Sequence, residues 1–184
     1  HAAPIGDYQP SIHPSYLRLL YCSFIDHSHF NTVVLSQTMR HINDLLNFST
    51  ADLTEILDCA IKIKASPEDY RDALPHQSLA MLFQKTSTRT RVSFEVAMTE
   101  LGGHAIYMDW QTSNFILTDL AYEIEYLSRN VQVIMARLLS NDDFQIMADA
   151  SQVPMINGCC DRYHPCQALT DVLTMIEHSE KPLP

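Results

Sequence analysis

The chain has 184 residues, of which 46% are hydrophobic and 18% are charged, a composition that suits one ordinary folded domain and excludes a disordered polyelectrolyte. Twelve Lys and Arg residues against 22 Asp and Glu residues give a net charge of −10, which argues against a surface that binds nucleic acid or anionic membranes. No apolar run approaches the roughly 20 residues of a membrane span, so we expect neither nucleic acid nor membrane as a partner.

Residues 1–37 carry three prolines and no sustained periodicity, and we expect a weakly structured N-terminal extension there. Within it, His27 and His29 are interpreted as solvent-exposed side chains in preference to a metal pair. The five cysteines are odd in number and form no C-x-x-C pair, which favours reduced thiols and a cytoplasmic location. The chain does not open with Met, and its first residues lack the Arg-rich composition of a transit peptide, so targeting stays open; the mitochondrial matrix is the alternative location if the source is eukaryotic.

From residue 38 onward, helical and strand patterns alternate. Ser49, with an acidic residue three positions later, is typical of a helix N-terminus, and Gly102-Gly103 is typical of a helix end. In chain order the patterns predict a helix over 49–65, a strand over 78–83, a helix over 90–101, a strand over 104–109, a helix over 120–131, a strand over 131–136, a helix over 142–150, a strand over 153–158 and a helix over 166–178.

This alternation predicts an α/β fold, a three-layer domain with a parallel β-sheet flanked by helices on both faces. In such sheets ligands bind beyond the carboxyl ends of the strands. Three turns that follow strands carry polar residues which could meet there, over 84–91, 137–141 and 157–167.

The first of these turns, K-T-S-T-R-T-R, enters a helix directly after an apolar strand. Backbone N–H groups, hydroxyls and a guanidinium at a helix N-terminus form an anion site, and we interpret the cluster as a phosphate-binding turn. The alternative is that Ser and Thr only cap the helix while Arg91 pairs with Glu95 at i, i+4. For Arg91 alone we prefer that structural interpretation.

Four motifs, "STRTRVSFE", "LGGHAIY", "IMAR" and "YHPCQALTD", occur in this order, and together they resemble the aspartate/ornithine carbamoyltransferase family from about His41 to His178. The "GGHA" segment and Cys166 within "HPCQ" are more similar to the ornithine branch. The resemblance implies a carbamoyl phosphate-binding domain over 38–163 and, over 164–184, a linker helix toward a second, acceptor-binding domain. The implied reaction converts carbamoyl phosphate and L-ornithine to L-citrulline and phosphate, without a metal or another cofactor.

The resemblance also implies which residues act. The carbamoyl phosphate site would comprise Ser87, Thr88, Arg89, Thr90, Arg137, His164 and Gln167, with Thr90, Arg137 and His164 as its catalytic members. His164 would donate to the carbonyl oxygen and Gln167 would accept from the carbamoyl NH2 group. Cys166 is interpreted as packing or a neighbour of the site, since it has no basic partner nearby in sequence, and Cys159-Cys160 as buried filler.

The segment 110–123 departs from the family pattern, which in ornithine-type enzymes supplies a residue to a neighbouring subunit. The resemblance implies a homotrimer, but Trp110, Gln111, Ser113 and Asn114 are only candidates for that donated residue. The chain ends at Pro184 without the acceptor-binding motifs, so we expect this half alone to be poorly active. Two alternatives stay open: carbamoyl transfer to another amine such as aspartate or putrescine, and a non-catalytic phosphate-binding or assembly module.

Overall fold

Four parallel strands form the centre of the molecule. The computed structural model describes residues 41–179, so the expected extension over 1–37, with His27 and His29, lies outside the described residues. The sheet has the order β2-β1-β3-β4, and every pairing is parallel. Its strands are β1 (Ser78–Phe83), β2 (His104–Asp109), β3 (Val133–Arg137) and β4 (Met155–Cys159).

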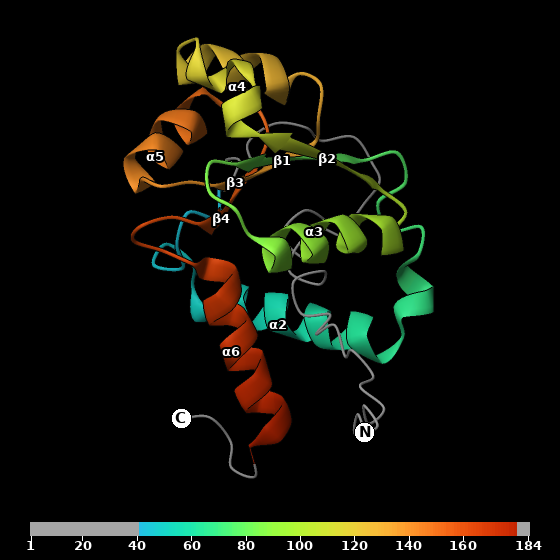
Figure 1. The fold of residues 1–184 in the computed structure, drawn as a ribbon. Helices are drawn as coiled ribbons and strands as arrows, with labels where there is room; N and C mark the ends of the chain where they lie inside the picture. The colour runs from blue at the N-terminus through green and yellow to red at the C-terminus, as the bar shows by residue number, and fades with distance from the viewer. Residues whose placement is uncertain (1–40, 180–184) are drawn as a thin grey trace, which may run out of the picture.

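Helices cover both faces of this sheet, as Figure 1 shows. On one face lie α2 (Thr50–Ala65), α3 (Thr88–Glu100) and α6 (Pro165–His178), and on the other lie α4 (Leu120–Ser128) and α5 (Asn141–Ala150). Short 3-10 helices occupy Pro67–Tyr70, Trp110–Thr112 and Asn114–Ile116. The predicted α/β class, with its three layers, is therefore confirmed.

Each central strand is buried on both sides, which explains its continuous apolar sequence. In β1, Leu79 and Met81 pack on the face with α3, while Ala80 and Leu82 pack on the opposite face. Alternate residues of a strand point to opposite faces, so one six-residue run contributes to two cores. Phe94 of α3 is buried in the first core.

The start of α2 and the end of α3 are marked by the capping residues that the sequence indicated, Ser49 and Gly102. The Ser49 amide donates to Asp52 Oδ2 at 2.8 Å and the Asp52 amide donates to Ser49 Oγ at 3.2 Å, which closes a capping box at the start of α2. Beyond α3, Gly102 has φ +84 and a Cβ there would lie 2.4 Å from the Arg71 carbonyl oxygen. A residue with a side chain would be strained at this position.

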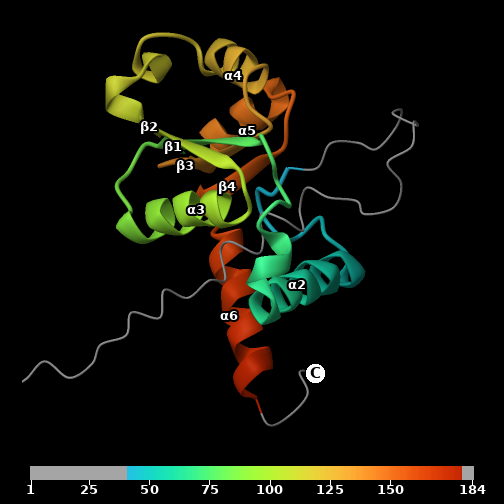
Figure 2. The ribbon, with the colours of Figure 1, turned by 90° about the vertical axis from the view of Figure 1, so that its right-hand side faces the viewer.

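The largest difference from the predicted boundaries is at α4, which ends at Ser128 instead of residue 131, and β3 correspondingly begins at Val133 instead of residue 131. Gln132 is exposed and closes the turn before the strand, since its Oε1 accepts from the Ser78 amide at 2.8 Å. At the other end of the domain, α6 leaves the sheet and extends away from it, as Figure 2 shows. None of the helices within residues 41–179 is long and apolar enough to cross a bilayer.

Candidate functional site

The carboxyl ends of β1, β3 and β4 bring three turns to one edge of the sheet. Phe83 pairs with Arg137 in register, and Arg137 pairs with Cys159 across a bulge. The turns after β1 and β3 are tied together, because the Gln84 amide donates to the Arg137 carbonyl at 2.9 Å and Gln84 Oε1 accepts from the Leu139 amide at 2.7 Å. The three turns that were predicted to contribute ligand-binding residues are therefore neighbours.

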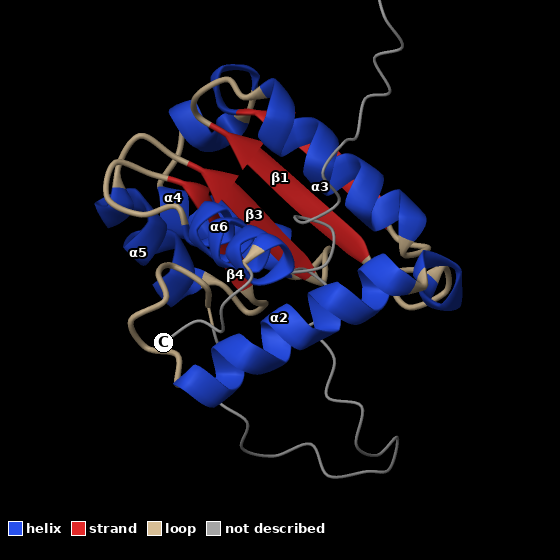
Figure 3. Cartoon of the chain, turned by 90° about the horizontal axis from the view of Figure 1, so that it is seen from below, coloured by secondary structure: helices blue, strands red, loops and turns tan. Residues whose placement is uncertain are grey.

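The first turn leads into α3, which runs alongside β1 in Figure 3. Ser87 is the N-cap of this helix: its Oγ accepts from the Thr90 amide at 3.4 Å and donates to Thr90 Oγ1 at 3.0 Å. Thr90 is only 5% exposed, whereas Thr88 and Arg89 are exposed. The first turn of a helix carries N–H groups without intrahelical acceptors, so α3 presents these donors beside an exposed guanidinium.

Arg89 and Arg91 have different surroundings although they are two residues apart. Arg91 Nε lies 3.2 Å from Glu95 Oε1, and its guanidinium stacks 3.7 Å from the centre of the Tyr107 ring. This confirms the structural interpretation of Arg91. The side chain of Arg89 makes no hydrogen bond or ion pair with any residue in 41–179, and its charge is available to a ligand.

Arg137 extends from the end of β3 to the start of α3. Its Nη1 donates to Thr90 Oγ1 at 3.3 Å and to the Gly158 carbonyl at 3.1 Å, which joins all three turns. Its Nε is buried and has no partner within the described part of the chain. A buried donor left unsatisfied costs about 1–3 kcal/mol, a cost that an oxygen of a bound anion would offset.

His164 stands directly before α6, whose first residue is Pro165. Burial lowers the pKa of His164 below its ordinary value, and the positive charges of Arg137 and Lys85 lower it further, while Asp171 acts in the opposite direction. The imidazole is therefore neutral at pH 7, with one donor and one acceptor nitrogen. Its Nδ1 is buried and, like the Arg137 Nε, has no partner among residues 41–179.

The remaining predicted residue, Gln167, lies on the first turn of α6. Its Nε2 donates to Asp171 Oδ1 at 2.8 Å, so the side chain points toward the residue one turn later in the same helix. Direct hydrogen bonds thus connect Ser87, Thr90 and Arg137, and the charge of Arg137 acts on His164.

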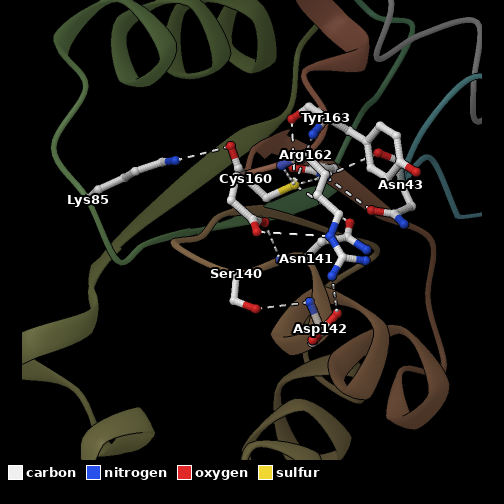
Figure 4. A network of polar contacts seen from close by, with 10 residues as sticks. Asn43, Lys85, Ser140, Asn141, Asp142, Cys160, Arg162 and Tyr163 are labelled. Atoms are coloured by element: carbon white, nitrogen blue, oxygen red, sulfur yellow. Dashed lines mark hydrogen bonds and ion pairs between the residues drawn. The ribbon is translucent and has the colours of Figure 1, made fainter.

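Lys85 is a nearby cation that was not among the predicted site residues. Its Nζ donates to the Cys160 carbonyl at 3.3 Å, as Figure 4 shows, and its charge acts on His164. The available signal in the sequence was a lysine at the start of the K-T-S-T-R-T-R turn.

The cysteines within residues 41–179 differ in their surroundings. Burial raises the pKa of Cys166 to about 12, so this residue does not supply a thiolate at neutral pH, in agreement with a packing role. Cys59 is disulfide-bonded, and the prediction that all five thiols are reduced is wrong for this residue. Cys160 is buried as predicted, whereas Cys159 is only half-buried, so the prediction of burial is wrong for Cys159. Three N–H groups donate to the Cys160 sulfur, so Cys160 makes specific polar contacts in addition to packing.

Within residues 41–179, no three His, Cys, Asp or Glu side chains gather into a group that could hold a metal ion. Trp110 is buried and stacks on Phe115, with ring centres 5.0 Å apart, so Trp110 serves packing. Gln111 and Asn114 are exposed and Ser113 is half-buried.

The family model for the aspartate/ornithine carbamoyltransferase carbamoyl phosphate-binding domain matches residues 40–177. The catabolic ornithine carbamoyltransferase of Halobacterium salinarum is 39% identical over 140 residues, which cover 76% of this chain and 48% of that protein. The ornithine carbamoyltransferase of Nitrobacter winogradskyi is 42% identical, with 78% and 48% covered.

Among solved structures, the ornithine carbamoyltransferase of Pyrococcus furiosus superposes with a TM-score of 0.73 at 41% identity, covering 78% of this chain and 47% of that one. The chain spans about half the length of the curated relatives it matches. The matched residues include all three turns at the carboxyl edge of the sheet. The chain therefore belongs to the aspartate/ornithine carbamoyltransferase family, within which it corresponds to the carbamoyl phosphate-binding domain.

Proposed function

We propose that the protein transfers the carbamoyl group of carbamoyl phosphate to L-ornithine, giving L-citrulline and phosphate, and that this chain supplies the carbamoyl phosphate site. The observation that carries the proposal is Arg137, whose guanidinium bonds to Thr90 and Gly158 while its buried Nε has no partner within residues 41–179. A planar cation with a free buried donor suits the oxygens of a phosphate ester.

Binding would start at α3. The phosphate would take the N–H groups of its first turn together with the hydroxyls of Ser87, Thr88 and Thr90, and Arg89 would close over it from the exposed side. Charge-assisted hydrogen bonds contribute about 1.5–3 kcal/mol each, which is enough to hold a dianion locally although the protein carries a net charge of −10. Salt screens the distant carboxylates but has less effect on a partly buried pair.

Transfer requires no nucleophile from the protein. The neutral amine attacks the carbonyl carbon, the bond from that carbon to the bridging phosphate oxygen breaks with its electron pair going to that oxygen, and the proton lost by the amine passes to the departing phosphate. Positioning and stabilisation of the developing charge account for the catalysis. His164, neutral because burial and nearby cations lower its pKa, would donate to the carbonyl oxygen beside Arg137 and Thr90. Gln167 would turn from Asp171 to accept from the carbamoyl NH2 group.

Several features of the working protein belong to the same proposal. Residues 38–163 would form the carbamoyl phosphate domain and 164–184 a linker to an acceptor-binding domain, since the exposed Met175 and Ile176 on α6 continue beyond the core contributed by Leu169 and Leu173. Homologous ornithine carbamoyltransferases support L-ornithine as the acceptor. A homotrimer and a cytoplasmic location, or the mitochondrial matrix in a eukaryote, complete the proposal.

The test is a carbamoyl-transfer assay with labelled carbamoyl phosphate against L-ornithine, L-aspartate and putrescine, run on the protein in its longest natural form. We expect labelled L-citrulline to be the main product. A main product from another amine would replace the acceptor while keeping the site. No transfer to any amine, together with carbamoyl phosphate binding by calorimetry, would favour the non-catalytic phosphate-binding module.

A further inference from the structure

Cys160 lies where the three turns at the carboxyl edge of the sheet meet. Figure 4 shows its sulfur and carbonyl at the centre of a network of polar contacts. Three N–H groups converge on the sulfur: Asn157 Nδ2 at 3.2 Å, the Arg162 amide at 3.3 Å and the Tyr163 amide at 3.2 Å. A thiol is a weak acceptor that makes few hydrogen bonds, so three donors on one sulfur mark a specific local arrangement.

The network closes a short turn directly before His164. The Cys160 amide donates to the Tyr163 carbonyl at 3.0 Å, while the Tyr163 amide donates back to the sulfur. The next residue is His164, whose carbonyl accepts the first hydrogen bond of α6, from the Ala168 amide at 3.1 Å. The imidazole is therefore held between a turn closed by Cys160 and the start of a helix.

The same residue reaches the other two turns. Lys85, from the turn after β1, donates to its carbonyl at 3.3 Å. Asn141, at the start of α5, places Oδ1 3.6 Å from the sulfur, and the Asn141 amide donates to Asp161 Oδ1 at 2.7 Å. Cys160 is only 7% exposed and Asn141 only 8%, so the contact between the Cys160 sulfur and Asn141 is screened from water.

Backbone strain next to Cys160 indicates that the turn is held in place. Cys159 has φ 132, a region that side chains rarely adopt, and its amide donates to Asn157 Oδ1 at 3.0 Å. Such a conformation persists only where the surroundings over-determine it. The fully buried Asn157 is fixed in turn by Asn43, whose carbonyl and Oδ1 each lie 3.1 Å from Asn157 Nδ2.

We propose that Cys160 is a positioning residue for the carbamoyl phosphate site: its sulfur, by accepting hydrogen bonds from the turn over 157–163, sets the depth and orientation of the His164 imidazole beside Arg137. This inference rests on the proposed function for its ligand. The geometry itself stands on contacts within this chain. Cys160 acts through His164 and does not contact the substrate.

The test compares Cys160→Ala, which deletes the acceptor, with Cys160→Ser, which keeps one, and with Cys159→Ala as the matched control at the neighbouring half-buried thiol. The pKa of His164 is measured by NMR titration of its ring protons, and the affinity for carbamoyl phosphate by calorimetry. A residue that only adds stability would change the unfolding midpoint without moving the native-state pKa.

With Cys160→Ala we expect the His164 pKa to rise toward its ordinary value, because the ring becomes less buried, and the affinity to fall by about five- to tenfold, as for one lost hydrogen bond. Cys160→Ser should return the His164 pKa toward the wild-type value and the affinity to within about twofold of the wild type. Cys159→Ala should change neither quantity. An unchanged His164 pKa in folded Cys160→Ala would overturn the inference.

Two further results keep this inference separate from the proposed function. If the wild type does not bind carbamoyl phosphate, the function fails, but the His164 titration still decides the positioning role. If Cys160→Ala does not fold, hydrogen exchange of the wild type decides: the Arg162 and Tyr163 amides should be protected by the sulfur, and exchange at the rate of an open loop would contradict the role.

Discussion

Replacing Arg137 by Met separates binding from stability at the centre of the site. The substitution keeps an unbranched side chain that reaches about as far as the arginine Nε, and it removes a guanidinium that bonds to Thr90 Oγ1 at 3.3 Å and to the Gly158 carbonyl at 3.1 Å. It also removes the buried Nε that has no partner within the described residues. The two lost bonds destabilise the native state, while loss of the unsatisfied donor stabilises it by about 1–3 kcal/mol.

These contributions oppose each other, so we expect the free energy of unfolding to change by no more than about 1 kcal/mol. Binding has no such compensation. Loss of even one charge-assisted hydrogen bond to the phosphate weakens affinity by about 1.5–3 kcal/mol, or roughly 10- to 150-fold. The pKa of His164 should rise as well, because the Arg137 charge is one of the causes that lower it.

Arg91→Met is the matched control, because it removes the same charge in the first turn of α3, the helix whose start Arg137 contacts from the end of β3. Its guanidinium is engaged by Glu95 and the Tyr107 ring, so carbamoyl phosphate affinity, measured by calorimetry at fixed ionic strength, should change by less than about twofold. Equal losses in the two variants would show that only general electrostatics acts at this edge, and would refute the assignment of Arg137.

Three shorter predictions follow from the same geometry. Arg89→Ala should lower carbamoyl phosphate affinity in calorimetry without shifting the thermal midpoint, since Arg89 is exposed and unpaired within residues 41–179; unchanged affinity would remove it from the site. The folded-state pKa of His164 and of His41 lies below the ordinary value, so the unfolded chain binds more protons and stability should fall as the pH drops below about 6.5. In denaturation midpoints measured from pH 8 to 5, His164→Gln should show a smaller loss of stability than the wild type. The same dependence of midpoint on pH in both proteins would contradict a buried neutral imidazole at His164. Cys166→Ala should keep carbamoyl phosphate affinity, and in the wild type this thiol should resist alkylation at pH 8, because burial raises its pKa to about 12; rapid native-state labelling would show that it is accessible.

The alternation of helices and strands could be predicted because each element carries its own pattern. The apolar run over 78–83 has strand length, Ser49 and Asp52 form a local capping box, and Gly102 has the positive φ that ends a helix. All of these signals depend on residues close together in sequence. The parallel sheet follows from the alternation, so the three turns were expected at one edge.

Contacts between distant residues were harder to predict. The bond from Arg137 to Thr90 spans 47 positions, and only the family resemblance suggested that the two side chains meet. The hydrogen bonds of the Cys160 sulfur could not be predicted, because cysteine in a sequence pattern resembles a small apolar residue. These bonds depend on a turn whose shape is set by Asn157 and by the positive φ of Cys159. The disulfide at Cys59 had no local signal either.

The most direct test of the central claim is NMR mapping of carbamoyl phosphate on the 184-residue chain. We predict that added ligand perturbs the backbone amides at the start of α3, shifts the Nε–H signal of Arg137 as that buried donor gains an acceptor, and raises the pKa of His164 as an anion arrives beside it. Saturating carbamoyl phosphate that leaves Arg137 Nε–H and His164 unchanged, or that perturbs only residues away from the carboxyl edge of the sheet, would contradict the account.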